Sequence, residues 1–220
     1  MKNKLPFEPS ELAVVLSTRI CHDLAGPISS VNNGVEFLYD NSIDAEMKRS
    51  TVDLLAMGAS ESQAKLQMIR IALGRIDVDA TSGVEEFIEI VNDYFAHRKI
   101  IIKWNDSRVN NDRISCRERR IIANTILVIS SLMVYGGLIS VNIDNTGKVL
   151  EVVGENYKIK EDNSLVEILD SDSDYAELTP QNVIVWMLRS CVEEDGARIS
   201  CNIDIVDSKG EVKIATYLDS

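Results

Sequence analysis

The 220-residue chain has few of the side chains that build metal centres and disulfide frameworks. It contains four cysteines, at positions 21, 116, 191 and 201, and two histidines, His22 and His97. No pair of cysteines has the two-residue gap of a zinc knuckle or a redox motif, so a structural zinc site is not expected. The opening residues MKNKLPFEPSEL lack an apolar stretch suited to a secretory signal. We therefore expect the reducing environment of the cytoplasm.

Positive charge is also scarce. Lys and Arg number 23 against 35 Asp and Glu, which gives a formal net charge of −12. Such a surface repels phosphate backbones and anionic lipids, so we expect no nucleic-acid partner and no membrane partner. Aromatic residues make up only 5% of the chain, whereas hydrophobic residues make up 45%. Aliphatic side chains must therefore build the core, and the chain is long enough to do so without disulfides or metals.

One long uncharged run stands out, the 23 residues from 121 to 143. A membrane-spanning helix needs about 20 mainly apolar residues. Polar residues interrupt the run at 124, 125, 130 and 131, and Gly136-Gly137 breaks it. We interpret the run as a buried helix followed by a buried strand, with a membrane span as the alternative.

Residues 1–76 have the periodicity of two long helices joined by a short turn. The first helix is expected to start at Pro9, with Ser10 as its N-cap, and to run to about Tyr39. The second runs from about Asp44 to Ile76 and keeps a strict heptad with one polar member, which is typical of a left-handed bundle. The two apolar stripes are Leu12, Leu16, Ile20, Leu24, Ile28, Val31, Val35 and Leu38, and then Val52, Leu55, Ala59, Ser62, Leu66, Ile69, Leu73 and Ile76.

Further apolar side chains lie off these stripes. They are Val14, Val15, Cys21, Phe37, Leu54, Met57 and Met68. A lone helical hairpin leaves them uncovered, whereas pairing with a second copy encloses them in a four-helix bundle. We therefore predict a homodimer. The alternative is that the hairpin packs on the rest of its own chain.

Residues 77–220 are predicted to form a second domain, an α/β sandwich with a mostly antiparallel sheet, which makes the whole chain α+β. A linker at 77–83 leads into it. Thr179-Pro180 is expected to cap the last helix, and turns are expected at 145–147 and 208–210. The predicted helices span 83–96, 114–135, a short segment near 165, and 180–194, and the predicted strands span 99–104, 138–144, 148–153, 197–206 and 211–218.

The chain contains no GxSxG, GxxxxGK[ST], HExxH or GxGxxG motif. His22 is therefore the candidate reactive residue. His22 lies two residues from both Ile20 and Leu24, which is about 200° around the helix from the core stripe. Its imidazole is therefore predicted to face solvent. The neighbours of the ring one and two turns later are the small residues Ala25, Gly26 and Ser29. They leave room for a large partner to reach the ring.

Pro27, at the fifth position after His22, removes one helical hydrogen bond and is expected to bend the helix. A His followed at once by an acidic residue, with Pro five places on, resembles the phosphoacceptor box of two-component sensor kinases. More closely, CHDLAGPISSVNNGVEFL, within residues 19–38, resembles the signature of the ChpT-type histidine phosphotransferases of alphaproteobacterial phosphorelays. In that signature CHDL-x-GP and NNG-x-E-x-L stand at the same spacing. The resemblance is weaker over the second helix.

The C-terminal region resembles a GHKL-type ATPase domain only in the order of its elements. A working domain of that type needs a helix with an Asn for magnesium, a DxGxG segment and a Gly-rich lid. None of the 11 glycines forms GxG, residues 155–195 contain none, and Ser130-Ser131 stands where the Asn belongs. Without backbone amides free to wrap phosphates, the domain is expected not to bind ATP. ChpT-type proteins carry such a degenerate domain, so the resemblance implies no cofactor.

The resemblance implies that His22 carries a phosphoryl group between the aspartates of two receiver domains. Histidine suits this task because it titrates near neutrality and so offers a nucleophilic lone pair. The implied partners are the receiver domains of a hybrid histidine kinase and of response regulators. The magnesium ion that neutralises the phosphoryl oxygens would sit in the acidic pocket of the receiver, so this chain needs no metal of its own.

Four neighbours of His22 have roles that the sequence leaves open. Asp23, about 100° around the helix, either orients the imidazole or is a solvated acid. Arg19 either meets the phosphate or an acidic receiver rim, or it pairs with Asp23 or another acid. Asn33 falls on the stripe of small residues beside the histidine and is placed to touch a docked receiver, whereas Asn32 is expected to bond across the bundle.

Two other hypotheses keep the same fold. One is an autophosphorylating sensor kinase, against which the glycine pattern argues. The other is a non-catalytic dimeric adaptor that binds receiver domains or other helical partners through the acidic C-terminal domain. His97 is expected to cap a helix C-terminus. The three cysteines other than Cys21 are expected to be small core residues.

Overall fold

The computed structural model describes residues 5–40, 42–74, 83–96, 98–105, 114–144, 148–156, 159–160, 162–170, 173, 175–194, 196–206 and 209–218. Several predicted features lie outside these ranges. They are most of the linker at 77–83, the end of the second helix at 75–76, the turn at 145–147 and the role of His97.

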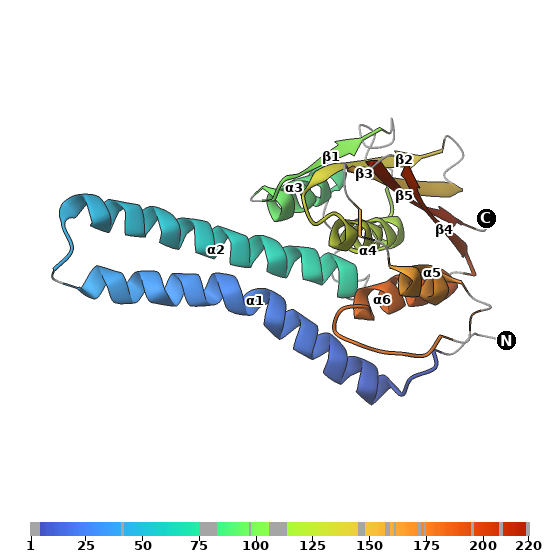
Figure 1. Cartoon of the computed structure of the whole chain (residues 1–220), viewed down its shortest axis with the longest axis horizontal. Helices are drawn as coiled ribbons and strands as arrows, with labels where there is room; N and C mark the ends of the chain where they lie inside the picture. Colours follow the sequence, from blue (N-terminus) through green and yellow to red (C-terminus); the bar gives the residue numbers. More distant parts are fainter. Residues whose placement is uncertain are drawn as a thin grey trace.

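The first helix, α1 (Pro9–Tyr39), begins without a side-chain cap. Glu8 is the N-cap residue, so the prediction that Ser10 caps the helix is wrong. Pro9 takes the first helical position. The amide hydrogen that proline lacks would have no helical partner there, and its fixed φ suits the helix. The helix continues through Pro27, and it changes direction along its length, as the proline predicts (Figure 1).

The second helix, α2 (Ala45–Leu73), runs back along α1 to complete the hairpin. Its N-cap is Asp44, whose carboxylate accepts a hydrogen bond from the Met47 amide at 2.8 Å. Two glycines bring the helices close together. A Cβ on Gly34 would lie 2.8 Å from the side chain of Leu55, and a Cβ on Gly58 would lie 3.0 Å from that of Val31.

Only part of each predicted apolar stripe lies in this seam. On α1, Ile28 is 55% exposed and Val35 41% exposed, although most of the other stripe residues are half-buried. On α2, Val52 and Leu66 are about half exposed, at 52% and 50%, while Leu55 and Ser62 are half-buried. The hairpin alone therefore leaves an apolar face uncovered.

Among the residues that the structure describes, nine elements follow the hairpin and form the predicted α+β arrangement, which is confirmed. They are α3 (Val84–Phe95), β1 (Ile100–Trp104), α4 (Cys116–Leu132), β2 (Gly137–Ile143), β3 (Val149–Asn156), α5 (Asn163–Leu169), α6 (Val183–Glu194), β4 (Arg198–Val206) and β5 (Lys209–Tyr217). The strands form one sheet in the order β1-β2-β3-β5-β4. β1 and β2 are parallel, and the other three neighbouring pairs are antiparallel.

Two helices are shorter than predicted. α4 ends at Leu132 instead of residue 135, and the chain then turns through Gly136, whose φ of 90° suits glycine. α6 begins at Val183 instead of 180. Before it, Thr179 and Asn182 bond reciprocally, backbone amide to side chain, at 2.8 and 3.2 Å. Thr179 therefore caps a turn that leads into the helix, rather than the helix itself.

The molecule has three layers, with helices between the hairpin and the sheet (Figure 1). α4 is central, and Ile122, Ile126 and Ile129 on it are fully buried. This confirms the interpretation of the run at 121–143 as a buried helix and a strand. In the described part of the chain, no helix has both the length and the apolar character needed to span a membrane.

The hairpin is anchored to the C-terminal domain at its open end. Met68 and Ala72 of α2 are completely buried, and the side chain of Asn124 on α4 donates a hydrogen bond to the Ala72 carbonyl at 2.7 Å. Met68 is therefore covered by its own chain, and its assignment to a dimer interface is wrong. Phe7, ahead of α1, packs edge-on against Trp186 of α6, with ring centroids 4.9 Å apart.

Candidate functional site

His22 projects from the middle of α1 with 85% of its side chain exposed. The exposure that the helical geometry predicts is thus confirmed. The predicted small neighbours Ala25, Gly26 and Ser29 are also exposed, and a Cβ built on Gly26 would meet no atom within 4 Å. A partner can therefore approach the imidazole along α1 without displacing any side chain of this stripe.

Asp23 stands between the imidazole and a guanidinium. One carboxylate oxygen, Oδ1, lies 3.7 Å from Nδ1 of His22. The other, Oδ2, accepts a hydrogen bond from Nε of Arg19 at 2.7 Å. The ion pair of Arg19 with Asp23, one of the two expectations, is present, and contact of Arg19 with phosphate or a receiver stays a prediction. Because Nδ1 is the ring nitrogen beside Asp23, Nε2 is the nitrogen left to face a partner.

Pro27 has a second consequence besides the bend. A proline has no amide, so the carbonyl four residues earlier, that of Asp23, loses its helical donor. Lys65 of α2 takes that place, and its Nζ donates to the Asp23 carbonyl at 3.0 Å. The same ammonium pairs with Glu61 at 2.9 Å, and the Lys65 side chain is only 14% exposed. The turn that carries His22 and Asp23 is therefore tied to the second helix.

Arg19 also reaches the C-terminal domain. Its Nη1 donates to the backbone carbonyl of Pro180 at 3.1 Å, across 161 residues of sequence. Pro180 lies in the turn held by Thr179 and Asn182, directly before α6. The Arg19 guanidinium thus joins the turn of α1 that carries Asp23 to the segment directly before α6.

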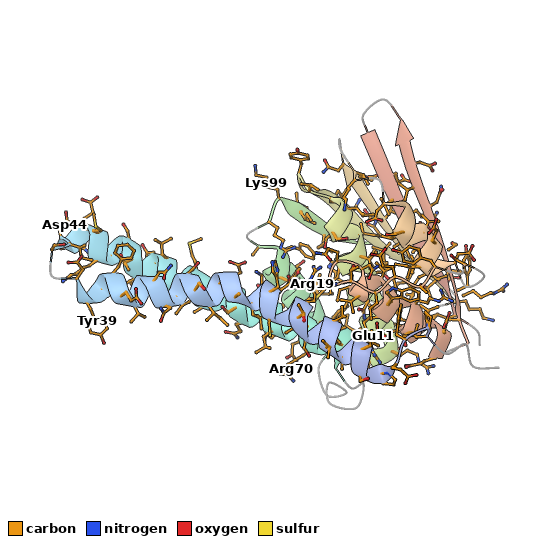
Figure 2. All side chains as sticks on the ribbon, turned by 60° about the horizontal axis from the view of Figure 1, so that its bottom comes forward. Glu11, Arg19, Tyr39, Asp44, Arg70 and Lys99 are labelled. Carbon is orange, nitrogen blue, oxygen red and sulfur yellow. The ribbon has the colours of Figure 1, made fainter. Side chains whose placement is uncertain are left out.

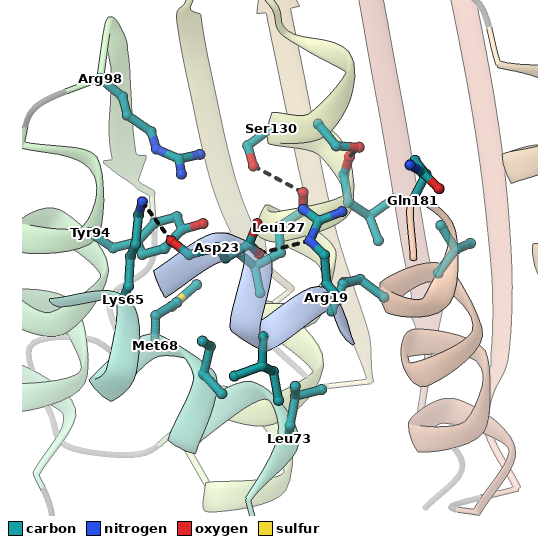
Figure 3. Close-up of a pocket in the computed structure, with 16 residues that line it drawn as sticks. Arg19, Asp23, Lys65, Met68, Leu73, Tyr94, Arg98, Leu127, Ser130 and Gln181 are labelled. Atoms are coloured by element: carbon teal, nitrogen blue, oxygen red, sulfur yellow. Dashed lines mark hydrogen bonds and ion pairs between the residues drawn. The ribbon is translucent and has the colours of Figure 1, made fainter. Parts of the chain in front are cut away.

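Arg19 and Asp23 line one side of a cleft between the hairpin and the C-terminal domain (Figure 3). Tyr94 and Arg98 lie opposite, with the Arg98 guanidinium 4.5 Å above the Tyr94 ring. Burial raises the pKa of the Tyr94 phenol, so the ring stays neutral. The rest of the lining is Ile20, Lys65, Met68, Ile69, Leu73, Leu127, Val128, Ser130, Ser131, Gln181, Ile184 and Val185.

Ser130 and Ser131 of α4 line this cleft. Both hydroxyls donate to carbonyls of their own helix, at 2.9 and 2.6 Å. Among the residues that the structure describes, no three His, Cys, Asp or Glu side chains come together as a metal site.

The two asparagines of the motif lie on the exposed surface of α1. Asn33 is exposed, as expected for a residue on the His22 stripe. Asn32 bonds to Glu36 of its own helix at 3.1 Å, so the prediction of a bond across the bundle is wrong. Asn32 thus supports the surface of α1 and makes no contribution to the seam.

Three apolar residues that we predicted to be enclosed by a second copy are exposed in the single chain. Phe37 is 57% exposed and lies eleven residues after Gly26, which returns it to nearly the same side of the helix. On α2, Leu54 and Met57 precede Gly58, and their side chains are 61% and 50% exposed. Tyr39 and Asp44 mark the end of the hairpin that extends away from the C-terminal domain (Figure 2).

The described structure thus combines an exposed histidine on a helical hairpin with a layered α/β domain. Residues 84–205 match the family described as histidine phosphotransferase C-terminal domain. That match covers more than half of the chain, and the chain belongs to this family. The matched residues lie in the C-terminal domain, after the helix that carries His22.

Two known proteins are similar to this chain, one in sequence and one in structure. Protein phosphotransferase ChpT of Brucella abortus (strain 2308) is 26% identical over 140 residues, which is 62% of this chain and 62% of that protein. The chain thus matches about three fifths of the length of this relative. A solved structure described as a bacterial phosphotransferase is 19% identical and has a TM-score of 0.73, over 96% of this chain and 100% of that one. These findings confirm the ChpT-type resemblance and the fold.

Proposed function

We propose that the chain is a histidine phosphotransferase of a two-component phosphorelay, in which His22 carries a phosphoryl group between receiver-domain aspartates. The observation that carries this proposal is the 85% exposed imidazole beside Asp23, in a member of the histidine phosphotransferase family. Membership supports the class of reaction, and the geometry supports His22 as its site.

The transfer needs few groups from this chain. The lone pair on Nε2 of His22 attacks the phosphorus of an aspartyl phosphate in line, so that a P–N bond forms and the P–O bond to the aspartate breaks. The receiver aspartate leaves as a carboxylate. Asp23 faces the Nδ1 proton and stabilises the charge that develops on the ring. A second receiver aspartate reverses these steps and takes the phosphoryl group away.

The receiver supplies the remaining parts. Its acidic pocket holds the magnesium ion that neutralises the phosphoryl oxygens, and this chain contributes no metal ligand. Its proposed docking surface here is the exposed stripe of Ala25, Gly26, Ser29 and Asn33 on α1, continued by the exposed Phe37. Small residues near the ring admit the receiver, and Phe37 farther out gives it apolar area to bury.

The direct test is transfer from a ³²P-labelled receiver domain to the purified full chain. We expect label on this chain that is stable in alkali and lost in acid, as a phosphoramidate is, and that passes on to a second unlabelled receiver. Binding of the receiver without any transfer would instead indicate a non-catalytic adaptor.

We also propose that two copies of the chain form a four-helix bundle through their hairpins. The uncovered apolar face of the hairpin supports this. Ile28 and Val35 of α1, with Val52 and Leu66 of α2, remain exposed. Ile28 lies six residues after His22, about 120° around the helix, so a partner copy on this face leaves the imidazole free.

Light scattering of the wild type is expected to give about 49 kDa, twice the 24.5 kDa of one chain. Ile28→Asp places a charge in the proposed interface and is expected to shift the mass toward 24.5 kDa at micromolar concentration, because an unpaired buried charge opposes association. Ser29→Asp, on the receiver side of the same helix, is the control and should leave the mass unchanged. A wild-type monomer would contradict the bundle.

We further propose that the C-terminal domain binds no ATP and that the protein acts in the cytoplasm. The absence of a GxG sequence and the inward bonding of Ser130 and Ser131 support the first proposal. Four free cysteines, with Cys21 exposed, suit a reducing compartment. Calorimetric titration with Mg-ATP is expected to show no binding heat up to millimolar nucleotide. Micromolar binding would favour the sensor-kinase hypothesis instead.

A further inference from the structure

Asp23 is held from two sides by cations that belong to different parts of the fold. Arg19 donates Nε to its carboxylate at 2.7 Å, and Lys65 donates Nζ to its backbone carbonyl at 3.0 Å. About a third of the side chains of Arg19 and Asp23 is exposed, 29% and 32%. The bond from Arg19 limits rotation of the Asp23 carboxylate, and the bond from Lys65 ties the backbone that carries it to α2.

The direction of the carboxylate matters for His22. With Oδ2 bound to Arg19, Oδ1 is the oxygen left beside Nδ1 of the imidazole, 3.7 Å away. A carboxylate in that place favours the ring form with the proton on Nδ1 and the lone pair on Nε2. The Arg19 cation also offsets the negative charge of Asp23.

Arg19 is itself held by the C-terminal domain. While Nε binds Asp23, Nη1 binds the carbonyl of Pro180 at 3.1 Å. The planar guanidinium makes both bonds at once, which the single ammonium of a lysine on a flexible stem does less well. The position of the turn before α6 is therefore imposed on the Asp23 carboxylate.

We propose that Arg19 is a positioning residue, which holds Asp23 against the imidazole of His22 and does so under the control of the C-terminal domain at Pro180. This inference rests on the proposed function and adds a task for the C-terminal domain, which orients the phosphoacceptor through a single side chain. On this proposal Arg19 acts through Asp23 and not on the transferred phosphoryl group itself.

The first experiment measures which ring nitrogen of His22 carries the proton, and it needs no transfer activity. The chain has two histidines, so uniform ¹⁵N-histidine labelling of the full-length protein gives two ring systems, and His22→Ala assigns them. In the wild type we expect the His22 nitrogens to report mainly the form protonated on Nδ1. In Arg19→Met we expect a shift toward the form protonated on Nε2. Unchanged ring populations in Arg19→Met would overturn the proposal.

The second experiment separates positioning from docking. With phosphorylated receiver in excess, we expect Arg19→Met to lower the single-turnover rate constant roughly tenfold and to change the half-saturating receiver concentration less than twofold. Arg19→Lys should recover only part of the rate. The matched control is Arg98→Met, which removes the same charge from the opposite wall of the cleft without touching Asp23 and should cost less than twofold. An equal loss in Arg98→Met would overturn the proposal.

A double-mutant cycle tests whether Arg19 acts through Asp23. In an Asp23→Asn background, Arg19→Met should slow transfer less than twofold, since the group that it positions is already altered. An undiminished tenfold loss there would contradict the proposal. Failure of the wild type to accept phosphate would instead contradict the proposed function, and the ring populations would still test the positioning of His22. Thermal melting of each variant shows that it is folded.

Discussion

His22→Ala is expected to abolish phosphate transfer to the chain, with a loss of roughly a thousandfold or more relative to the wild type. No other side chain on this surface supplies a neutral nitrogen nucleophile. The fold should tolerate the change, because the imidazole is 85% exposed and alanine is the best helix former. The measurement is the initial rate of labelling by a ³²P-labelled receiver domain, with thermal melting as a check on folding.

The matched control for this experiment is His97→Ala, which removes the other histidine of the chain. We expect it to be labelled at the wild-type rate. Labelling of His22→Ala at a comparable rate would show that the phosphoryl group is carried elsewhere and would leave the adaptor hypothesis as the better explanation of any receiver binding.

Arg189→Met is expected to lower the free energy of unfolding by about 3–5 kcal/mol, because it breaks a buried ionic network by removing one partner. The Arg189 side chain is 10% exposed and pairs with Glu193 at 2.7 Å. Its Nη1 also donates to the carbonyls of Ile168 and Asp170 at the C-terminal end of α5, at 3.0 and 3.3 Å. Its guanidinium lies 5.5 Å from the centre of the Trp186 ring.

Urea unfolding followed by circular dichroism measures this effect. Arg198→Met, at an exposed position on β4, makes the same chemical change outside the network and should alter the free energy of unfolding by less than about 0.5 kcal/mol. Adding Glu193→Met to Arg189→Met should cost less than the sum of the two single changes, since the pair is lost only once. Strict additivity would argue against a coupled network.

The sequence indicated most of the fold because its elements carry strong local patterns. The spacing of apolar residues predicted the two long helices, and the uncharged run ending at Gly136-Gly137 predicted a buried helix and a strand. Errors occurred at helix ends, where a few contacts decide the boundary. The turn bonded by Thr179 and Asn182 delays α6 by three residues, and Pro9 makes a capping serine unnecessary in α1.

The candidate site was predictable only in part, and for a physical reason. The exposure of His22 follows from helical geometry within a few residues of sequence. The bonds from Lys65 to Asp23 and from Arg19 to Pro180 join positions 42 and 161 residues apart. They depend on how the hairpin lies against the C-terminal domain, which no local pattern records. The sequence shows that Pro27 lacks a backbone amide donor, but it does not show that the Lys65 side chain replaces that donor.

The bend at Pro27 divides α1 into two stretches whose exposed positions are under different constraints. Residues before it contact the body of the molecule through Arg19, so substitutions there disturb internal geometry. Exposed residues after it, such as Asn33 and Phe37, can be substituted without disturbing that contact. On the proposed function, duplicated genes can therefore diverge in which receiver they bind through these exposed distal positions, while the histidine and its supporting contacts stay the same.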